Sequence, residues 1–256
     1  MYGVLNTVDK IKRYFAFSKE EIKWIAISVL VLGLIVGMNE CAFSLDKQCE
    51  ASHANFDAVR LAFNLLNSIV IVALALLVHE AAHRVYGLDI GFRVEFQPWI
   101  YGLVAGVMIS IMTYGKLIFI TSGGIILHVL ETHRLGYFRY NRSNSTIGLT
   151  AVMGPYANIL LAIMFKALGF LPGGLIHKAM MINILFAVYN MLPIPPLDGA
   201  HAFFANRGFY LLTFGSIIGM SLLLTFQSSI TLVLIGGIFF AFAFQQLFFR
   251  VLEKYI

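Results

Sequence analysis

The stretch Leu61–Leu88, LAFNLLNSIVIVALALLVHEAAHRVYGL, decides how the rest of the chain is interpreted. As far as Val78 it carries no charged side chain, and a helix of about 20 apolar residues is long enough to cross a bilayer. The ionisable residues that follow on the same predicted helix are His79, Glu80, His83 and Arg84. Ionisable groups at membrane depth are costly, and they mark functional sites. The stretch therefore predicts a transmembrane helix that carries such a site.

The composition excludes an ordinary water-soluble protein. Of the 256 residues, 59% are hydrophobic and only 12% are charged, whereas soluble domains carry about 25% charged residues. The formal net charge of +5 is better explained by membrane topology and anionic lipid headgroups than by nucleic acid, because the basic residues flank apolar runs. We expect the lipid bilayer as a partner and no nucleic acid.

Apolar segments of spanning length recur along the whole chain. We therefore predict an all-α polytopic membrane protein with about six transmembrane helices, forming one domain over residues 1–256 with its core at about 60–200. The expected spans are Ile22–Met38, Leu61–Leu88, Ile147–Leu168, Ile176–Leu192, Phe209–Phe226 and Ile230–Phe249.

The distribution of lysine and arginine predicts the orientation, because cytoplasmic flanks are enriched in these residues. The N-terminal stretch holds Lys10, Lys12, Arg13, Lys19 and Lys23, and Arg250 and Lys254 follow the last predicted span. The loop Asn39–Asp57 has one lysine against four acidic residues, so we expect it outside the cell. The chain is accordingly predicted to be a multi-pass cell-membrane protein with both termini in the cytoplasm.

A shorter apolar segment, Tyr101–Met112, follows the second predicted span. It is too short to cross the bilayer unaided, so we interpret it as re-entrant. The flanking segments Phe92–Phe96 and Leu117–Thr121 have the composition of short strands. Irregular backbone at this depth must line protein or a water-filled cavity. The alternative is that Tyr101–Met112 forms a seventh span.

The sequence His79-Glu80-Ala81-Ala82-His83 is the strongest chemical signal. Residues four apart share one face of a helix, so both imidazoles can bind a single Zn²⁺. Glu80 then lies beside the open coordination position, where it can act as the catalytic base. The alternative is that the histidines are satisfied by hydrogen bonds within a helical bundle.

Zinc in a catalytic site needs a third protein ligand, and Asp198 is the best candidate. It follows three prolines in Asn190–Gly199, NMLPIPPLDG, and is a lone carboxylate in an apolar setting. The alternative is an ordinary Asp-Gly turn. His79 lies about 13 Å along the helix before Leu88, and the fourth predicted span also runs inward. Both motifs thus reach a similar depth, nearer the cytoplasmic face.

Three motifs together resemble the site-2 protease family of intramembrane zinc metalloproteases, in the minimal prokaryotic form without a PDZ domain. They are HExxH inside a transmembrane helix, GPxxN at Gly154–Asn158, and NxxPxxPLDG at Asn190–Gly199. The resemblance implies that His79, His83 and Asp198 bind zinc and that Glu80 is the base. It also implies that Asn190 polarises the scissile carbonyl, although an asparagine there can equally bond a neighbouring helix. Ala82 departs from the glycine often found before the second histidine.

The predicted function is zinc-dependent hydrolysis of peptide bonds within or next to transmembrane segments of substrate proteins. The alternative is a divalent-metal transporter or sensor, in which histidine and aspartate form a transit site. Such a site has no use for Glu80 as a base. His201, three residues after Asp198, is either a spare ligand or a solvated histidine. A disulfide between Cys41 and Cys49, the substrate and the oligomeric state stay open.

Overall fold

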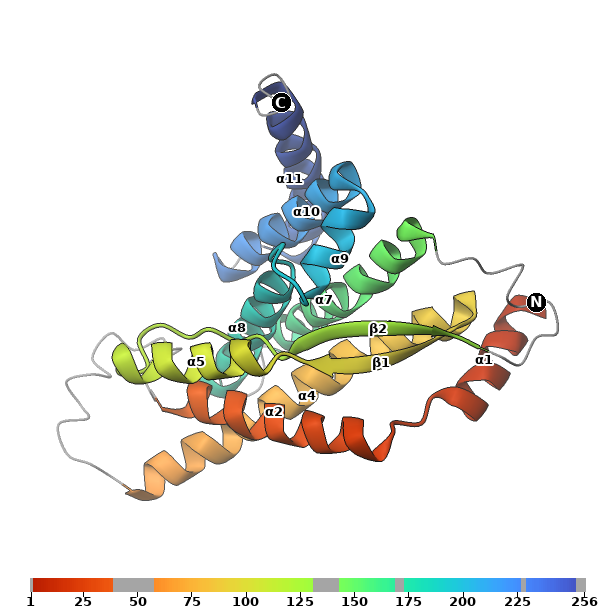
Figure 1. Ribbon diagram of the computed structural model, residues 1–256. Helices are drawn as coiled ribbons and strands as arrows, with labels where there is room; N and C mark the ends of the chain where they lie inside the picture. Colours follow the sequence, from red (N-terminus) through yellow and green to blue (C-terminus); the bar gives the residue numbers. More distant parts are fainter. Residues whose placement is uncertain (1, 39–57, 131–142, 169–172, 227–228, 252–256) are drawn as a thin grey trace.

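The chain is mostly helical and has one small sheet, as predicted (Figure 1). The computed structural model describes residues 2–38, 58–130, 143–168, 173–226 and 229–251, so Cys41 and Cys49 lie outside the described residues. The elements are α1 (Tyr2–Tyr14), α2 (Lys19–Gly37), α4 (Ala58–Ile90), β1 (Phe92–Pro98), α5 (Ile100–Met112), β2 (Gly123–Val129), α7 (Asn144–Ala167), α8 (Gly173–Asn190), α9 (Asp198–Ala205), α10 (Arg207–Thr225) and α11 (Ile230–Val251).

Four of the described helices, α4, α7, α10 and α11, are long and apolar enough to cross a membrane. Helices also form at the other two expected spans, as α2 and α8. However, α2 begins with four charged residues within its first five positions, and α8 is only 18 residues long and carries Lys178. Length and composition thus support a membrane protein with four spans, and the count of six remains a prediction.

Helix α4 lies at the centre of the fold. It packs against α2 on one side and α7 on the other, and α8 packs against α7. One apolar core joins α2, α4 and α8, with Leu32, Leu76 and Phe186 fully buried. A second core joins α7, α8, α10 and α11. Helices α10 and α11 pack mainly on each other (Figure 1).

The two strands form an antiparallel hairpin along α4 (Figure 1). Helix α4 ends at Ile90, and Gly91 at φ 96° allows the chain to turn into β1. The strand predicted at Phe92–Phe96 is confirmed as β1. Phe96 pairs with Ile125, and both side chains are buried.

The strand predicted at Leu117–Thr121 is wrong. That segment has no regular structure, and β2 begins only at Gly123. Ile118 and Ile120 are buried in the core beside α2, so their apolar character reflects packing rather than strand pairing. Gly123 and Gly124 are the first two residues of β2.

Helix α5 and the segment that follows it, up to residue 122, connect β1 to β2. Pro98 pairs with Gly123, so residues 99–122 leave and re-enter at the same end of the hairpin. The chain reverses after α5, where Tyr114 (φ 52°) and Gly115 (φ 73°) adopt left-handed conformations. This arrangement fits the re-entrant interpretation, because a seventh span would have separated the two strands.

Candidate metal centre

The two histidines of α4 project into the protein interior on the side of α7. They are one helical turn apart, and their side chains are almost completely buried. Their Nε2 atoms lie 3.1 Å apart. The shared helical face expected from the spacing is therefore present.

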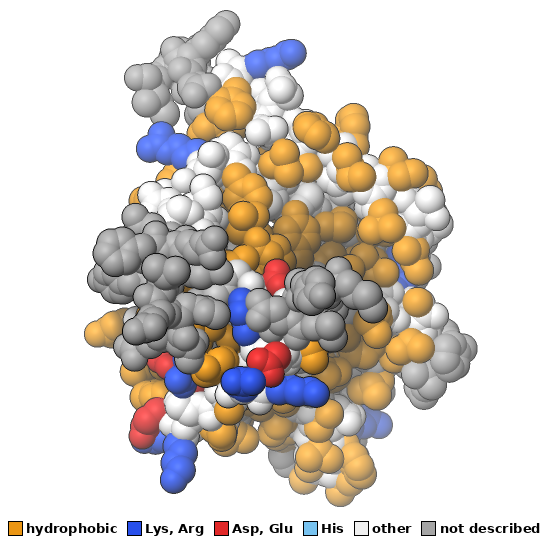
Figure 2. Space-filling view, turned by 90° about the vertical axis from the view of Figure 1, so that its right-hand side faces the viewer, with side chains coloured by type: hydrophobic (Ala, Val, Ile, Leu, Met, Phe, Trp, Pro, Cys, Tyr) orange, Lys and Arg blue, Asp and Glu red, His pale blue; other side chains and the backbone are white. Residues whose placement is uncertain are grey.

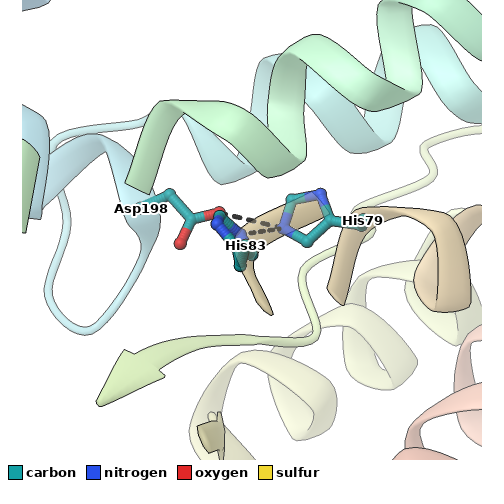
Figure 3. A group of neighbouring side chains, drawn as sticks. All are labelled: His79, His83 and Asp198. Carbon is teal, nitrogen blue, oxygen red and sulfur yellow. Dashed lines mark hydrogen bonds and ion pairs between the residues drawn. The ribbon is translucent and has the colours of Figure 1, made fainter. Parts of the chain in front are cut away.

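Asp198 completes a compact group with these histidines. Its Oδ2 atom lies 2.9 Å from His79 Nε2 and 3.3 Å from His83 Nε2 (Figure 3). Tetrahedral zinc with bonds of about 2.1 Å places its ligand atoms roughly 3.4 Å apart. The two nitrogens and the oxygen fit this geometry, so the three residues can hold a metal ion.

Hydrogen bonds on the far side of each imidazole orient both histidines. His83 Nδ1 lies 2.8 Å from the Thr150 carbonyl oxygen, which can only accept, so Nδ1 carries the proton. His79 Nδ1 donates in the same way to Asn158 Oδ1, at 2.6 Å. In the neutral form of each ring, Nε2 then carries a lone pair directed at the shared position.

The amide of Asn158 is itself fixed. Its Nδ2 donates to the Ala75 carbonyl and to Asn183 Oδ1, both at 3.0 Å. Asn183 in turn donates to Ala179 O at 2.8 Å. With both amide hydrogens used, Asn158 must present its oxygen to His79. A chain of neutral hydrogen bonds from α8 through α7 thus sets the tautomer of a metal-site histidine.

Because Gly154 has no side chain, a space remains between α7 and the two imidazoles. A Cβ atom at this position would lie 2.7 Å from His79 Nε2 and even closer to His83 Nε2. Any side chain here would fill the position that a metal occupies. In the GPxxN motif, Gly154 thus leaves room beside the imidazoles because it has no side chain, and Asn158 supplies an oriented amide. Sequence analysis did not assign these roles.

The turn after α8 carries Asp198 to this point. Helix α8 ends at Asn190, the Pro195–Pro196 peptide bond is cis, and Asp198 is the first residue of α9. Strand β2 runs past this turn so closely that a Cβ at Gly124 would overlap the Pro196 carbonyl. Asp198 is therefore held between α8 and the sheet, and it is a buried first residue of α9 rather than part of the ordinary Asp-Gly turn of the alternative interpretation.

Several buried polar atoms around the centre have no hydrogen-bond partner among the described residues. They are Glu80 Oε2, Asp198 Oδ1, Asn190 Oδ1 and His201 Nε2. Asn190 Nδ2 donates to Phe186 O in its own helix, at 3.1 Å, so the amide oxygen faces elsewhere. Because unpaired buried polar groups are costly, this arrangement suits a site that receives further groups. Burial lowers the pKa of His201, which lines a cavity of about 210 Å³ beside Pro195 and Pro196.

Comparison with known proteins agrees with this geometry. A protein of the archaeon Methanocaldococcus jannaschii, named "Putative zinc metalloprotease MJ0611", is 31% identical over 191 residues, which are 72% of this chain and 84% of that protein. The chain belongs to the family of that zinc metalloprotease. No family model matches the chain, and no solved structure matches it. The relative and the apolar helices together fit a membrane metalloprotease.

Within this zinc metalloprotease family member, the buried centre has the elements that hydrolysis requires. Two neutral imidazoles and one carboxylate can hold a metal ion. Glu80, between the two histidines in sequence, is a buried carboxylate with an unpaired oxygen, which can act as a base. Arg84, which sequence analysis noted without assigning it a role, is a buried cation one turn beyond Glu80. Its position immediately after His83 in a membrane helix was the available signal.

Proposed function

We propose that this protein is an intramembrane zinc metalloprotease of the site-2 type, which hydrolyses peptide bonds within or next to transmembrane segments of membrane proteins. The convergence of His79, His83 and Asp198 on one buried position, beside an unpaired Glu80 carboxylate, carries the proposal. The metalloprotease relative supports the reaction class. The apolar helix that carries the site supports catalysis at membrane depth.

The ligand atoms would be His79 Nε2, His83 Nε2 and a carboxylate oxygen of Asp198. When bound there, zinc supplies Lewis-acid activation of the scissile carbonyl and of water. Glu80 accepts the proton of the attacking water and later delivers it to the leaving amine. Thr150 and Asn158 hold the two imidazoles in the tautomer that leaves Nε2 unprotonated. Asn190, whose Oδ1 is unpaired, is proposed to orient the scissile peptide through its amide.

A transmembrane helix must unwind before its carbonyls can be attacked, because they are bonded within the helix. The outer edge of β2, the edge opposite β1, is proposed to hold the unwound substrate. In the observed register the N–H and C=O of Gly123 and Ile125 point away from β1, and they have no hydrogen-bond partner in the described ranges. An extended peptide can pair with such an edge. The face of β2 at Gly124 lies against the Pro196 carbonyl, in the turn that carries Asp198.

The membrane arrangement is proposed to comprise six spans, with both termini in the cytoplasm and the site nearer that face. His83 lies seven residues before the end of α4, about 10 Å along the axis. Lys10 of α1 donates to Asp89 O at that end of α4, which places the N-terminal helix there as well. Figure 2 looks onto that side of the molecule and shows charged side chains gathered near its centre, with apolar side chains over the flanks.

Replacing Glu80 by glutamine tests the proposal. Purified Glu80→Gln protein is expected to retain zinc, because no ligand changes, and to lose at least about 100-fold in cleavage of a transmembrane reporter in proteoliposomes. Zinc content is measured by elemental analysis and cleavage by fragment mass. Undiminished cleavage by this variant would sink the enzyme interpretation. Zinc flux across the same vesicles, equal for both proteins and without cleavage, would support the transporter instead.

A further inference from the structure

A buried ion pair lies on the sheet side of α4. The guanidinium of Arg84 bonds through Nη2 to Glu21 Oε1 of α2, and both side chains are almost fully buried. Arg84 also stacks on the Phe17 ring, with Cζ 3.9 Å from the ring centre. The pair thus lies at the junction of α4 and the beginning of α2.

The Glu21 carboxylate ties three elements together. Oε1 also accepts the Phe96 N–H of β1 at 2.9 Å, and Oε2 accepts the Ser18 N–H at 2.8 Å. The Ser18 hydroxyl accepts the Glu21 N–H in return, which completes a capping box at the beginning of α2. One side chain therefore fixes the beginning of α2, the residue after His83, and the backbone of β1.

The position of Phe96 makes this contact relevant to the candidate active site. Phe96 pairs directly with Ile125, whose N–H and C=O point to the outer edge of β2. On α4, Glu80, Arg84 and Gly87 share the face that meets β1, and a Cβ at Gly87 would collide with Val94. Glu21 thus holds the part of the sheet that lies over the helical face of Glu80.

Stability alone is a weak explanation for this ion pair. Burying two charges costs as much as, or more than, their attraction returns, and apolar replacements of similar volume are often neutral or stabilising. Arg84 Nε and Nη1 moreover have no partner among the residues that the structure describes. The ion pair is costly to bury and lies next to a candidate metal ligand. Its effect on the position of β1 therefore explains it better than a contribution to stability does.

We infer that the Arg84–Glu21 pair is a positioning device that sets the β1–β2 sheet over the candidate active site, so that β2 presents its outer edge to substrate in register with Glu80. The inference rests on the proposed proteolytic function. Arg84 and Glu21 are positioning residues in this account: they act through Phe96 and its partner Ile125. Loss of the pair should therefore weaken substrate binding and leave the metal in place.

The test compares four variants with the wild-type protein in nanodiscs. Glu21→Leu combined with Arg84→Met removes the charges and the acceptor while keeping apolar bulk, and Glu21→Leu alone removes the acceptor from an unchanged Arg84. Glu21→Gln retains a carbonyl oxygen for the Phe96 N–H. The control, Arg93→Met with Glu95→Leu, removes the partly exposed 3.2 Å ion pair of the same strand, together with the 3.3 Å contact of Glu95 with His128 of β2.

The apolar double variant is expected to keep zinc, to exchange the Phe96 amide about tenfold faster, and to raise the apparent KM about tenfold with kcat nearly unchanged, because a charge-assisted hydrogen bond is lost. The Arg93/Glu95 control should stay within about twofold of wild type in each measurement. Glu21→Gln keeps an acceptor for the Phe96 N–H but leaves the Arg84 charge without its partner, so a loss smaller than that of Glu21→Leu is expected. Hydrogen–deuterium exchange, zinc content and cleavage kinetics give the three readouts.

Either of two results overturns the inference: wild-type exchange and KM in the apolar double variant, or a loss in Glu21→Gln equal to that in Glu21→Leu. If the apolar double variant does not fold, the comparison of Glu21→Gln with Glu21→Leu decides alone. Absence of cleavage by the wild-type protein contradicts the proposed function instead. The exchange rate of the Phe96 amide still tests the positioning role in that case.

Discussion

The face of α4 that meets α7 and the face that meets the sheet hold their polar side chains in different ways. On the α7 side, His79 and His83 are oriented by a neutral amide and a backbone carbonyl. On the sheet side, Glu80 and Arg84 are ionisable groups with unpaired buried atoms. This contrast supports the proposal that the α7 side binds the metal, whereas the sheet side contacts substrate and transfers protons.

Gly154→Ala should break the α7 side most severely. The added methyl group would overlap both Nε2 atoms and exclude the metal. Zinc should be absent by elemental analysis, and cleavage should fall at least about 1,000-fold, because metal activation contributes several kcal/mol. Gly174→Ala is the matched control, since no atom lies within 4 Å of a Cβ at that position. Stoichiometric zinc in Gly154→Ala would contradict the assigned metal position.

Asn158→Leu should have the next largest effect. It leaves the Nδ1–H of His79 unpaired and releases the ring orientation, which typically costs 10- to 100-fold in metal affinity. Asn183→Leu removes only one of the two acceptors that fix Asn158, so a loss of about threefold is expected. Competition with a fluorescent zinc chelator measures both. Equal losses in the two variants would mean that the amide chain acts only through helix packing.

The outer edge of β2 supplies the corresponding test on the sheet side. Ile125→Pro removes an N–H that points away from β1, whereas Ile125→Ala keeps that N–H and loses the side chain. We expect cleavage to fall about tenfold further in the proline variant than in the alanine variant, with zinc retained in both. Equal activities of the two variants, measured with the same reporter, would contradict substrate binding at this edge.

The residues that converge at the candidate site could be named from sequence more readily than the architecture around them. The helical period singles out His79 and His83, and the rarity of carboxylates in an apolar chain, together with the family resemblance, singles out Asp198. Their convergence depends on α8, the proline turn and α9, which no local pattern describes. Asn158 was visible as a motif residue, but its role requires knowing which amide hydrogens are already used.

The features that sequence analysis predicted wrongly or missed are all determined by which residues pack together in the interior. Leu117–Thr121 is as apolar and β-branched as a strand because it packs beside α2. The strand begins instead at Gly123, and glycine is required at Gly124 by the close approach of the Pro196 carbonyl. Likewise, the pairing of Glu21 with Arg84 joins residues 63 positions apart, and nothing in either local sequence indicates it. Long-range packing determined each of these features.

Lys166 is a residue of α7 that contacts neither of these two faces of α4. Its replacement should therefore lower stability slightly without changing function, which is the smallest of the expected effects. Its Nζ donates to Leu224 O at the end of α10, at 2.8 Å. Lys166→Met should cost about 1 kcal/mol in the free energy of unfolding, or roughly 2–4 °C in a thermal scan in detergent. Zinc content and cleavage should stay at wild-type levels, because no contact of Lys166 reaches the centre. A change in zinc affinity would instead show that the α7–α10 contact is coupled to the metal site. Helix α10 would then have to be counted with α7 among the elements that hold the metal-binding side of α4.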